Sequence, residues 1–240
     1  MKVRLRYDKR GKIRFLSHRD LARVWERALR RAAVRVAYSE GFSPRPRLSF
    51  GLALSTGYES LGEYVDIDLH PEAGVEPTEL PALVTPSLPV GMTAQVAVPL
   101  DAGTESLQAA VTSSTWEIEV VGPDRAGLQA AVTRALEATA LAITVERKGS
   151  PVEVDARPAI LALALSDGEA PTLTAELATQ PRSLRPAELL RALDPAWREG
   201  RVLRTHQWTL VDGARCEPIP LGDLGARAAT SAPHAEARAS

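Results

Sequence analysis

The sequence contains too little cysteine for a protein held together by disulfides or by cysteine-bound metal. Cys216 is the only cysteine among the 240 residues. A single thiol cannot form an intrachain disulfide, and it cannot supply the cysteine clusters that hold structural zinc or an iron–sulfur centre. The P-loop, the dinucleotide-binding GxGxxG motif and the HExxH zinc motif are absent as well. We therefore expect a protein that needs no cofactor and no metal ion.

Long apolar segments are also missing. No apolar run approaches the roughly 20 residues that span a bilayer. The opening residues alternate basic and apolar side chains and lack the apolar block of a signal peptide. This pattern predicts a cytoplasmic protein that does not contact a membrane. Aromatic residues make up only 5% of a chain that is 45% hydrophobic, so Leu, Val, Ala and Ile must fill most of the core.

Charge is strongly segregated along the chain. Residues 1–50 contain fifteen Lys and Arg against four acids, a net charge of +11, whereas residues 51–110 contain nine acids and no Lys or Arg. A concentrated basic region attracts polyanions. The alternative is that the two segments neutralise each other within one domain. Glu63, Asp66 and Asp68 are close enough in sequence to suggest a metal site, but such acids are more often solvent-facing or paired with arginines.

Hydrophobic periodicity predicts two successive sets of helices and strands. The first set follows the order strand, helix, strand, strand, helix, strand, which is typical of the ferredoxin-like βαββαβ fold, and the second follows it with an extra extended segment. We therefore predict an α+β protein with two ferredoxin-like domains, at residues 1–100 and 112–218, and a disordered tail at 219–240. The expected strands are 3–7, 47–54, 63–69, 93–98, 116–121, 142–147, 160–165, 172–177 and 202–211, and the expected helices are 18–33, 77–84, 124–139 and 186–193.

The first predicted helix carries most of the functional signal. Ser17 is suited to cap its N-terminus, with Asp20 three residues later. An apolar stripe that includes Trp25 runs along one face of this helix. On the opposite face, arginines recur at i, i+4 spacing, at positions 19, 23, 27 and 30 or 31. Like charges at this spacing repel one another, and arginine binds phosphate bidentately. The pattern predicts a contact surface for a phosphate backbone; otherwise these arginines are solvated or pair with the acids of segment 59–79.

Two neighbouring features extend this basic region. His18 lies at the helix start, where it could donate to a phosphate or transfer a proton near neutral pH, although a histidine there is more often a capping or packing residue. The segment from Tyr38 to Arg47 combines aromatic, hydroxyl and arginine side chains around Phe42 and Arg45. Aromatic rings beside cations are what single-stranded nucleic acid binds, and they are also common in loops that pack on a domain.

The same region resembles a known family. Residues 14–21 (RFLSHRDL), 26–32 (ERALRRA), 37–46 (AYSEGFSPRP), 48–50 (LSF) and 62–66 (GEYVD) look like the signature of the radical SAM-linked protein family. That family is a domain of unknown function, fused to or encoded beside radical SAM proteins in some bacteria, and its genes often lie near those for ribonuclease E/G and ribosomal proteins. The resemblance implies a connection with RNA or ribosomes. This chain lacks the CxxxCxxC motif of the radical enzymes, so the resemblance identifies it with their linked partner.

Three functions remain open. The leading hypothesis is an RNA-binding accessory factor that acts on tRNA, rRNA or a ribosomal particle, with a radical SAM protein as a possible partner. The second is a metal-independent RNA-processing or RNA-modifying enzyme that uses His18. The third is a protein-interaction module that docks a radical SAM partner. The predicted nucleic-acid contacts are Arg14, Ser17, His18, Arg19, Arg23, Arg27, Arg30, Arg31, Tyr38, Phe42, Arg45 and Arg47.

Overall fold

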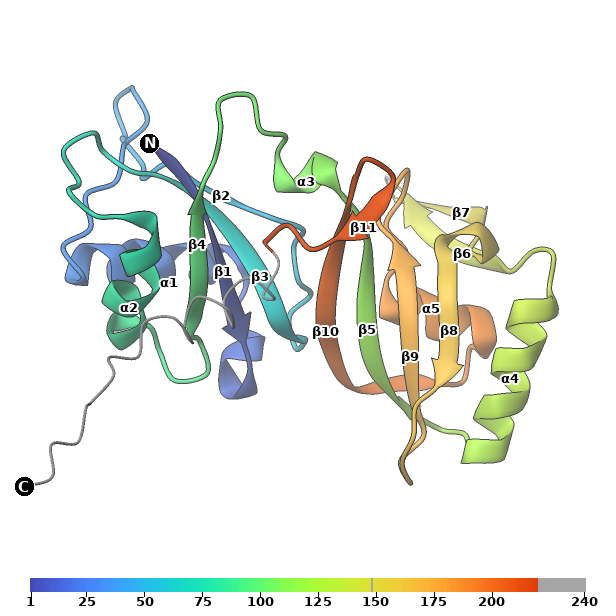
Figure 1. Ribbon diagram of the computed structural model, residues 1–240. Coiled ribbons are helices and arrows are strands. Elements are labelled where there is room, and N and C mark those ends of the chain that lie inside the picture. Colours follow the sequence, from blue (N-terminus) through green and yellow to red (C-terminus); the bar gives the residue numbers. More distant parts are fainter. Residues whose placement is uncertain (148, 220–240) are drawn as a thin grey trace, which may run out of the picture.

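A computed structural model describes residues 1–147 and 149–219. It shows a mixed α+β protein with a large, mostly antiparallel sheet, as the sequence predicts for the fold class (Figure 1). The strand order is β4-β1-β3-β10-β5-β9-β8, with β2 added on β3 and β11 on β10. Most of the predicted tail, 219–240, lies outside the described residues. Ile219 does not: it is buried against Tyr64 and Leu107, so the ordered chain continues past the predicted boundary.

The first half of the chain forms one end of this sheet. Its core consists of the inward side chains of the first strand, such as Leu5 and Tyr7, packed against Trp25 and Leu29 of the first helix. The predicted strand at 47–54 is shorter than expected, because only three of its residues pair with β3. The elements are β1 (Lys2–Lys9), α1 (His18–Arg31), β2 (Leu48–Phe50), β3 (Glu59–Asp68), α2 (Leu80–Val84) and β4 (Ala94–Pro99), with 3-10 turns at Gly11–Phe15, Pro77–Glu79 and Thr85–Ser87.

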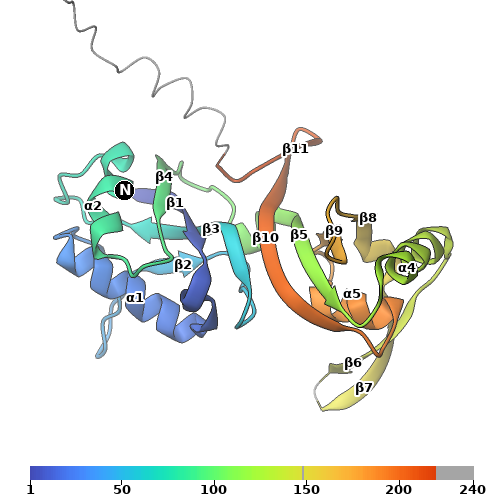
Figure 2. The same ribbon diagram turned by 90° about the horizontal axis from the view of Figure 1, so that it is seen from below.

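The second half forms the other end, with α4 and α5 beside its strands (Figures 1 and 2). Its elements are α3 (Leu107–Ala110), β5 (Val111–Val121), α4 (Arg125–Glu137), β6 (Ala142–Arg147), β7 (Ser150–Asp155), β8 (Ile160–Leu165), β9 (Thr172–Ala178), α5 (Pro186–Leu193), β10 (Arg198–Val211) and β11 (Ala214–Cys216). Strands β6 and β7 form a separate hairpin. One detail differs from the sequence analysis. Helix α3 lies in the gap between the two predicted domains, residues 101–111, and β5 begins at Val111, five residues before the strand predicted at 116–121.

The two halves meet where β3 and β10 run parallel. The pairing is short: Leu203 lies opposite Glu59 and Arg204 opposite Ser60. Beside it, the buried Arg204 guanidinium donates to Glu63, with contacts of 2.6, 2.7 and 3.1 Å, and to the Leu52 carbonyl at 3.0 Å. Buried charges are tolerated only when they are paired in this way. The junction therefore depends on an ion pair between residues 141 positions apart in the chain.

Two further contacts from β3 reach β10. The Arg201 Nε donates to the Glu59 carboxylate at 2.6 Å, and the Gly11 N–H donates to the other Glu59 oxygen at 2.6 Å. Tyr58, just before β3, donates its hydroxyl to Glu199. Burial acts to raise the pKa of Glu59, but the hydrogen bonds from Arg201 and Gly11 outweigh it and lower that pKa below its ordinary 4.5.

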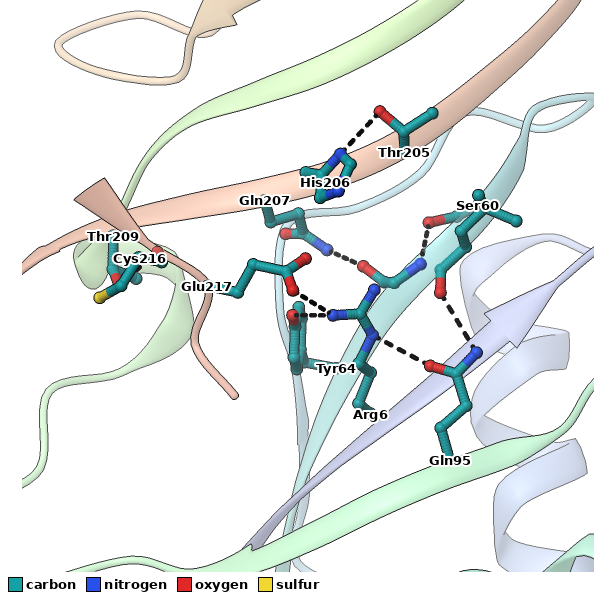
Figure 3. A network of polar contacts seen from close by, with 12 residues as sticks. Arg6, Ser60, Tyr64, Gln95, Thr205, His206, Gln207, Thr209, Cys216 and Glu217 are labelled. Carbon is teal, nitrogen blue, oxygen red and sulfur yellow. Dashed lines mark hydrogen bonds and ion pairs between the residues drawn. The ribbon is translucent and has the colours of Figure 1, made fainter. Parts of the chain in front are cut away.

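A third polar cluster ties the end of the described chain to the first half (Figure 3). The buried Arg6 guanidinium lies between Gln95, Tyr64 and Glu217, with contacts of 2.9 Å to Gln95 and 2.7 Å to Glu217. Gly62 lies directly beneath it: a Cβ at position 62 would lie 2.9 Å from Arg6 Nη2, so a larger residue would displace the guanidinium. Glu217 and Ile219, which follow β11, thus cover the face of the first half's strands on which Arg6 and Tyr64 lie.

Replacing Arg204 tests the importance of the junction. We expect Arg204→Met to lower the free energy of unfolding by about 3–5 kcal/mol, because it leaves the buried Glu63 carboxylate without a counter-ion. The double variant Arg204→Met/Glu63→Leu removes both charges and should recover much of that loss. Urea unfolding of the three proteins measures the difference. A double variant no more stable than the single one would contradict the ion pair as the cause.

Glu59 predicts a pH effect. Because its folded-state pKa lies below the ordinary value, its stabilisation is fully present above about pH 4.5 and disappears as the pH falls through the lowered value. We expect Glu59→Gln to cost about 1–3 kcal/mol at pH 7, as for a hydrogen bond to a charged group. The variant should also lose less stability than the wild type on acidification to pH 3. If the free energy of unfolding falls equally for the variant and the wild type between pH 7 and pH 3, Glu59 is not the group responsible.

Candidate nucleic-acid interface

The arginines of the basic segment divide into two groups. Arg4 and Arg6 on β1 are only 4% and 2% exposed. Arg4 forms a two-point contact with Asp66, at 2.8 and 3.0 Å, and Arg6 bonds Glu217. Lys9 is buried too, which lowers its pKa, and its ammonium contacts the carbonyls of Arg14 and Leu16. The basic region therefore does not present accessible charge along most of β1, because both faces of this strand are covered: its apolar side chains pack on the α1 side, and Arg4 and Arg6 are buried on the other.

The arginines of α1 remain on the surface. Ser17 caps the helix as predicted: its Oγ accepts from the Asp20 N–H at 3.2 Å and donates to the Asp20 carboxylate at 2.7 Å. The inward face carries Leu21, Trp25 and Leu29, which forces the polar face outward. The residues exposed on that face are Arg19, Arg23, Arg27, Arg30 and Arg31.

These five arginines have few internal counter-ions. Arg23 lies 3.4 Å from the exposed Asp20, a pairing that is weak at a solvated surface. Within the described part of the chain, the other four make no ion pair with a carboxylate. Arg19 to Arg31 spans about 18 Å of helix at 1.5 Å per residue. The helix thus presents a basic ridge, defined here as these five arginines.

A groove runs between the basic ridge and the segment 34–46. One hollow of about 470 Å³ is bordered by Arg19, Arg23 and Arg45. A neighbouring hollow of about 440 Å³ is bordered by Arg30 and Tyr38. Glu26 and Pro46 line both hollows, so the two adjoin, and together they are called the groove here. Arginines therefore border the groove on both walls, one carboxylate, that of Glu26, lies in both hollows, and one aromatic ring opens onto the groove.

The far wall of the groove is an ordered loop. An isolated bridge joins Tyr38 to Pro46, and the Ser39 N–H donates to the Arg45 carbonyl at 2.8 Å while the Arg45 N–H donates to Ser39 Oγ at 3.1 Å. Tyr38 is 53% exposed, and Phe42 at the loop tip is fully exposed. Both rings are therefore accessible for stacking.

Seven of the twelve predicted contact residues line neither hollow: Arg14, Ser17, His18, Arg27, Arg31, Phe42 and Arg47. Three of these have partners of their own. Arg14 is 3.8 Å from Glu59 and stacks over the ring of Phe15. Arg47 is 3.9 Å from Asp68. His18 packs edge-on against Phe50, with ring centroids 5.4 Å apart. Among the described residues, no carboxylate hydrogen-bonds His18, so the structure provides no orienting partner for a catalytic imidazole, and that role stays a prediction.

The downstream acids serve mainly as partners for basic residues. Glu63 pairs with Arg204, Asp66 with Arg4 and Lys2, and Glu72 with Arg35. The two segments therefore neutralise each other at β1, β3 and the loop ends, but not along the basic ridge. The described residues contain no group of three or more His, Cys, Asp and Glu side chains placed to hold a metal ion.

Sequence reasoning missed three titratable or charged residues of the groove, Glu26, Arg35 and His70. Arg35 and His70 line the hollow that contains Tyr38. Arg35 belongs to the basic segment and could have been included on charge alone. His70 comes from the turn after β3, and its backbone N–H donates to the Arg35 carbonyl at 3.0 Å. Only the pairing of distant segments reveals that position.

The fold and the groove define an α+β protein with a basic surface site. The chain belongs to the family described as "uncharacterized protein conserved in bacteria (DUF2344)", whose model matches residues 2–186. The match includes α1 and the whole groove. No curated protein matches the chain. Among the described residues, no helix is both long and apolar enough to cross a bilayer.

Proposed function

We propose that this protein is an RNA-binding accessory factor in RNA or ribosome maturation, and that the groove beside α1 holds the RNA. The observation that carries the proposal is the basic ridge: five exposed arginines on one helix face, four of them without a carboxylate partner among the described residues. By contrast, the arginines of β1, Arg4 and Arg6, form ion pairs with carboxylates inside the protein. Charge left unpaired on one face favours an external polyanion.

The geometry of the ridge fits a phosphate backbone. Arg19, Arg23 and Arg27 follow one another at i, i+4, about 6 Å apart along the helix axis. Their mutual repulsion destabilises the isolated helix by a few tenths of a kcal/mol per pair. Phosphates bound between the arginines replace this repulsion with attraction. Their binding also releases counter-ions from the RNA, and this release supplies most of the affinity of such contacts.

The opposite wall favours single-stranded over double-stranded RNA. Tyr38 is half exposed beside Arg30 and Arg35 in the same hollow. An unstacked base can lie on such a ring while its phosphates contact arginines, whereas bases inside a duplex cannot reach it. Unpaired regions of tRNA, rRNA or a ribosomal particle are therefore the proposed ligands.

We also interpret the sheet as two ferredoxin-like units. In the first half the order is β4-β1-β3-β2, and in the second it is β10-β5-β9-β8. Each corresponds to the order 4-1-3-2 when strands are numbered within their own unit, with the β6–β7 hairpin as an addition to the second. This interpretation is supported by the connections within each half and keeps the domain limits 1–100 and 112–218 as a proposal.

A radical SAM protein remains a proposed partner. That association comes from the resemblance of the segments around α1 and β3, and both lie inside the matched family region. A docking module for such a protein would also use an exposed basic face, so nuclease treatment before pull-down separates the two functions. The RNA-modifying alternative depends on His18, which packs on Phe50 at the base of α1.

Charge reversal on the ridge tests the proposal directly. We expect Arg19→Glu/Arg23→Glu/Arg27→Glu to reduce the affinity for single-stranded RNA by at least about a hundredfold at low salt. The slope of log affinity against log salt should fall by about 2, since each lost phosphate contact removes about 0.7. Fluorescence anisotropy with labelled oligonucleotides measures both quantities.

The matched control places the same charge change elsewhere. Arg125, Arg134 and Arg191 are exposed on α4 and α5, and Arg125→Glu/Arg134→Glu/Arg191→Glu alters the net charge by the same amount. This variant should bind nearly as well as the wild type. Equal weakening by both triple variants, or no measurable wild-type affinity at low salt, would refute the proposed site.

Tyr38 tests the preference for single strands. We expect Tyr38→Ala to weaken binding of single-stranded RNA by about 1–3 kcal/mol, roughly 5- to 150-fold, and to leave duplex binding unchanged. Tyr38→Phe keeps the ring and should bind normally. Phe15, which is 61% exposed outside the groove, supplies the control Phe15→Ala. Equal losses for Tyr38→Ala and Phe15→Ala would argue against stacking in the groove.

A further inference from the structure

A second cavity lies at the junction of the two halves. It has a volume of about 200 Å³, and its walls come from the segment 52–58, from β5 and β9, and from the turn that enters α5. None of the residues that line it borders the RNA groove. It is therefore a separate site, and it does not depend on the proposed RNA-binding function.

The lining of this cavity is rich in hydrogen-bond donors. It includes two arginines, Arg185 and Arg204, and the hydroxyl residues Ser55, Ser114 and Ser183, but no Asp or Glu. Trp116 and Leu177 supply apolar wall. Behind the lining, Glu63 neutralises Arg204 and Glu199 accepts from Tyr58, whereas Arg185 makes no ion pair among the described residues. Hydroxyl groups beside one unpaired guanidinium favour a ligand that accepts hydrogen bonds and carries negative charge.

Arg204 is held rigidly at the cavity. Its Nε and Nη2 contact Glu63, Nη2 also contacts the Leu52 carbonyl, and its guanidinium lies 5.3 Å from the centre of the Trp116 ring. Within the described chain, Nη1 has no protein acceptor. The ion pair with Glu63 therefore fixes the guanidinium and leaves one nitrogen for a further partner.

Ser114 offers the cavity a hydrogen-bonding group that no protein atom uses. It is 1% exposed, and its Oγ has no hydrogen-bond partner among the described residues. Nearly all buried hydroxyls in folded proteins are paired, because an unpaired one loses its hydration without compensation. Ser114 lines the cavity on β5, next but one to Trp116.

We propose that the junction cavity binds a small oxyanion: the phosphate or carboxylate group of a molecule with few carbon atoms. Arg204 and Ser114 hold the anionic group, Arg185 at the exposed mouth completes the charge, and Trp116 contacts the carbon skeleton. The size argues against a larger ligand, since pockets for drug-sized molecules measure about 300–1,000 Å³. Because segments of both halves line the cavity, its ligand also joins them.

Titration with two anions tests the site. Inorganic phosphate and acetate are added to the full-length ¹⁵N-labelled protein at constant ionic strength, with chloride as the reference. We expect saturable shifts of amide signals around Ser114 and Arg185 with at least one of the two anions. Tighter binding of phosphate assigns a phosphorylated ligand, and tighter binding of acetate assigns a carboxylate.

Variants decide whether the binding uses this cavity. Arg185 lies on the surface, so Arg185→Gln leaves the core intact. This variant should weaken anion binding about tenfold, as expected for the loss of one charge-assisted contact. Ser114→Ala should weaken it as well. Arg191→Gln, on the exposed face of α5 outside the cavity, should have no effect, and Ser114→Ala should leave RNA affinity unchanged.

The outcomes that overturn the proposal are distinct. If the amide shifts do not saturate with either anion, no oxyanion site exists at the junction. The same conclusion follows if Arg185→Gln and Arg191→Gln bind the anions with equal affinity. If Ser114→Ala unfolds, the Arg185→Gln comparison still decides. Loss of RNA binding in the ridge variant with anion binding intact would separate this site from the proposed function.

Discussion

The buried ion pair between Arg204 and Glu63 holds the two halves of the molecule in one sheet. The backbone pairing of β3 with β10 covers only two residue pairs, and a pairing that short provides few hydrogen bonds. The guanidinium adds contacts to Glu63 and Leu52, and Trp116 lies beneath it. Each charge is acceptable in the interior only while the other is present. The junction is therefore specific, since any other register of the two strands would bury a charge alone.

The same principle separates arginines that build the protein from those available to a ligand. Arg4 and Arg6 follow the strand alternation of β1 and meet Asp66 and Glu217. Arginines on α1 follow the helical period instead, and the apolar stripe around Trp25 turns them outward. Net charge along the sequence therefore overstates the basic surface. What remains after internal pairing is one ridge and the groove beside it, a smaller and more definite site than the basic segment as a whole.

Two possible binding sites result, with different physical character. The groove is open, basic and partly aromatic, which suits a flexible polymer whose affinity depends on salt. The junction cavity is small and fixed, and its donors are oriented by neighbours such as Glu63. A ligand there would contact both halves, whereas RNA in the groove would contact the first half alone. Binding at the two sites can thus be measured separately.

The sequence by itself determined the α+β class, the first helix with its Ser17 cap and an end two residues beyond the observed one, and the outward position of its arginines. Those features depend on local periodicity and capping, which act over a few residues. It could not show that Arg4 and Arg6 are buried, that β3 lies beside β10, or that His70 borders the groove. Each of these depends on partners far away in the chain: Arg6 meets Glu217 across 211 positions. The desolvation of a charge is decided by which distant group reaches it, and only the tertiary structure brings those groups together.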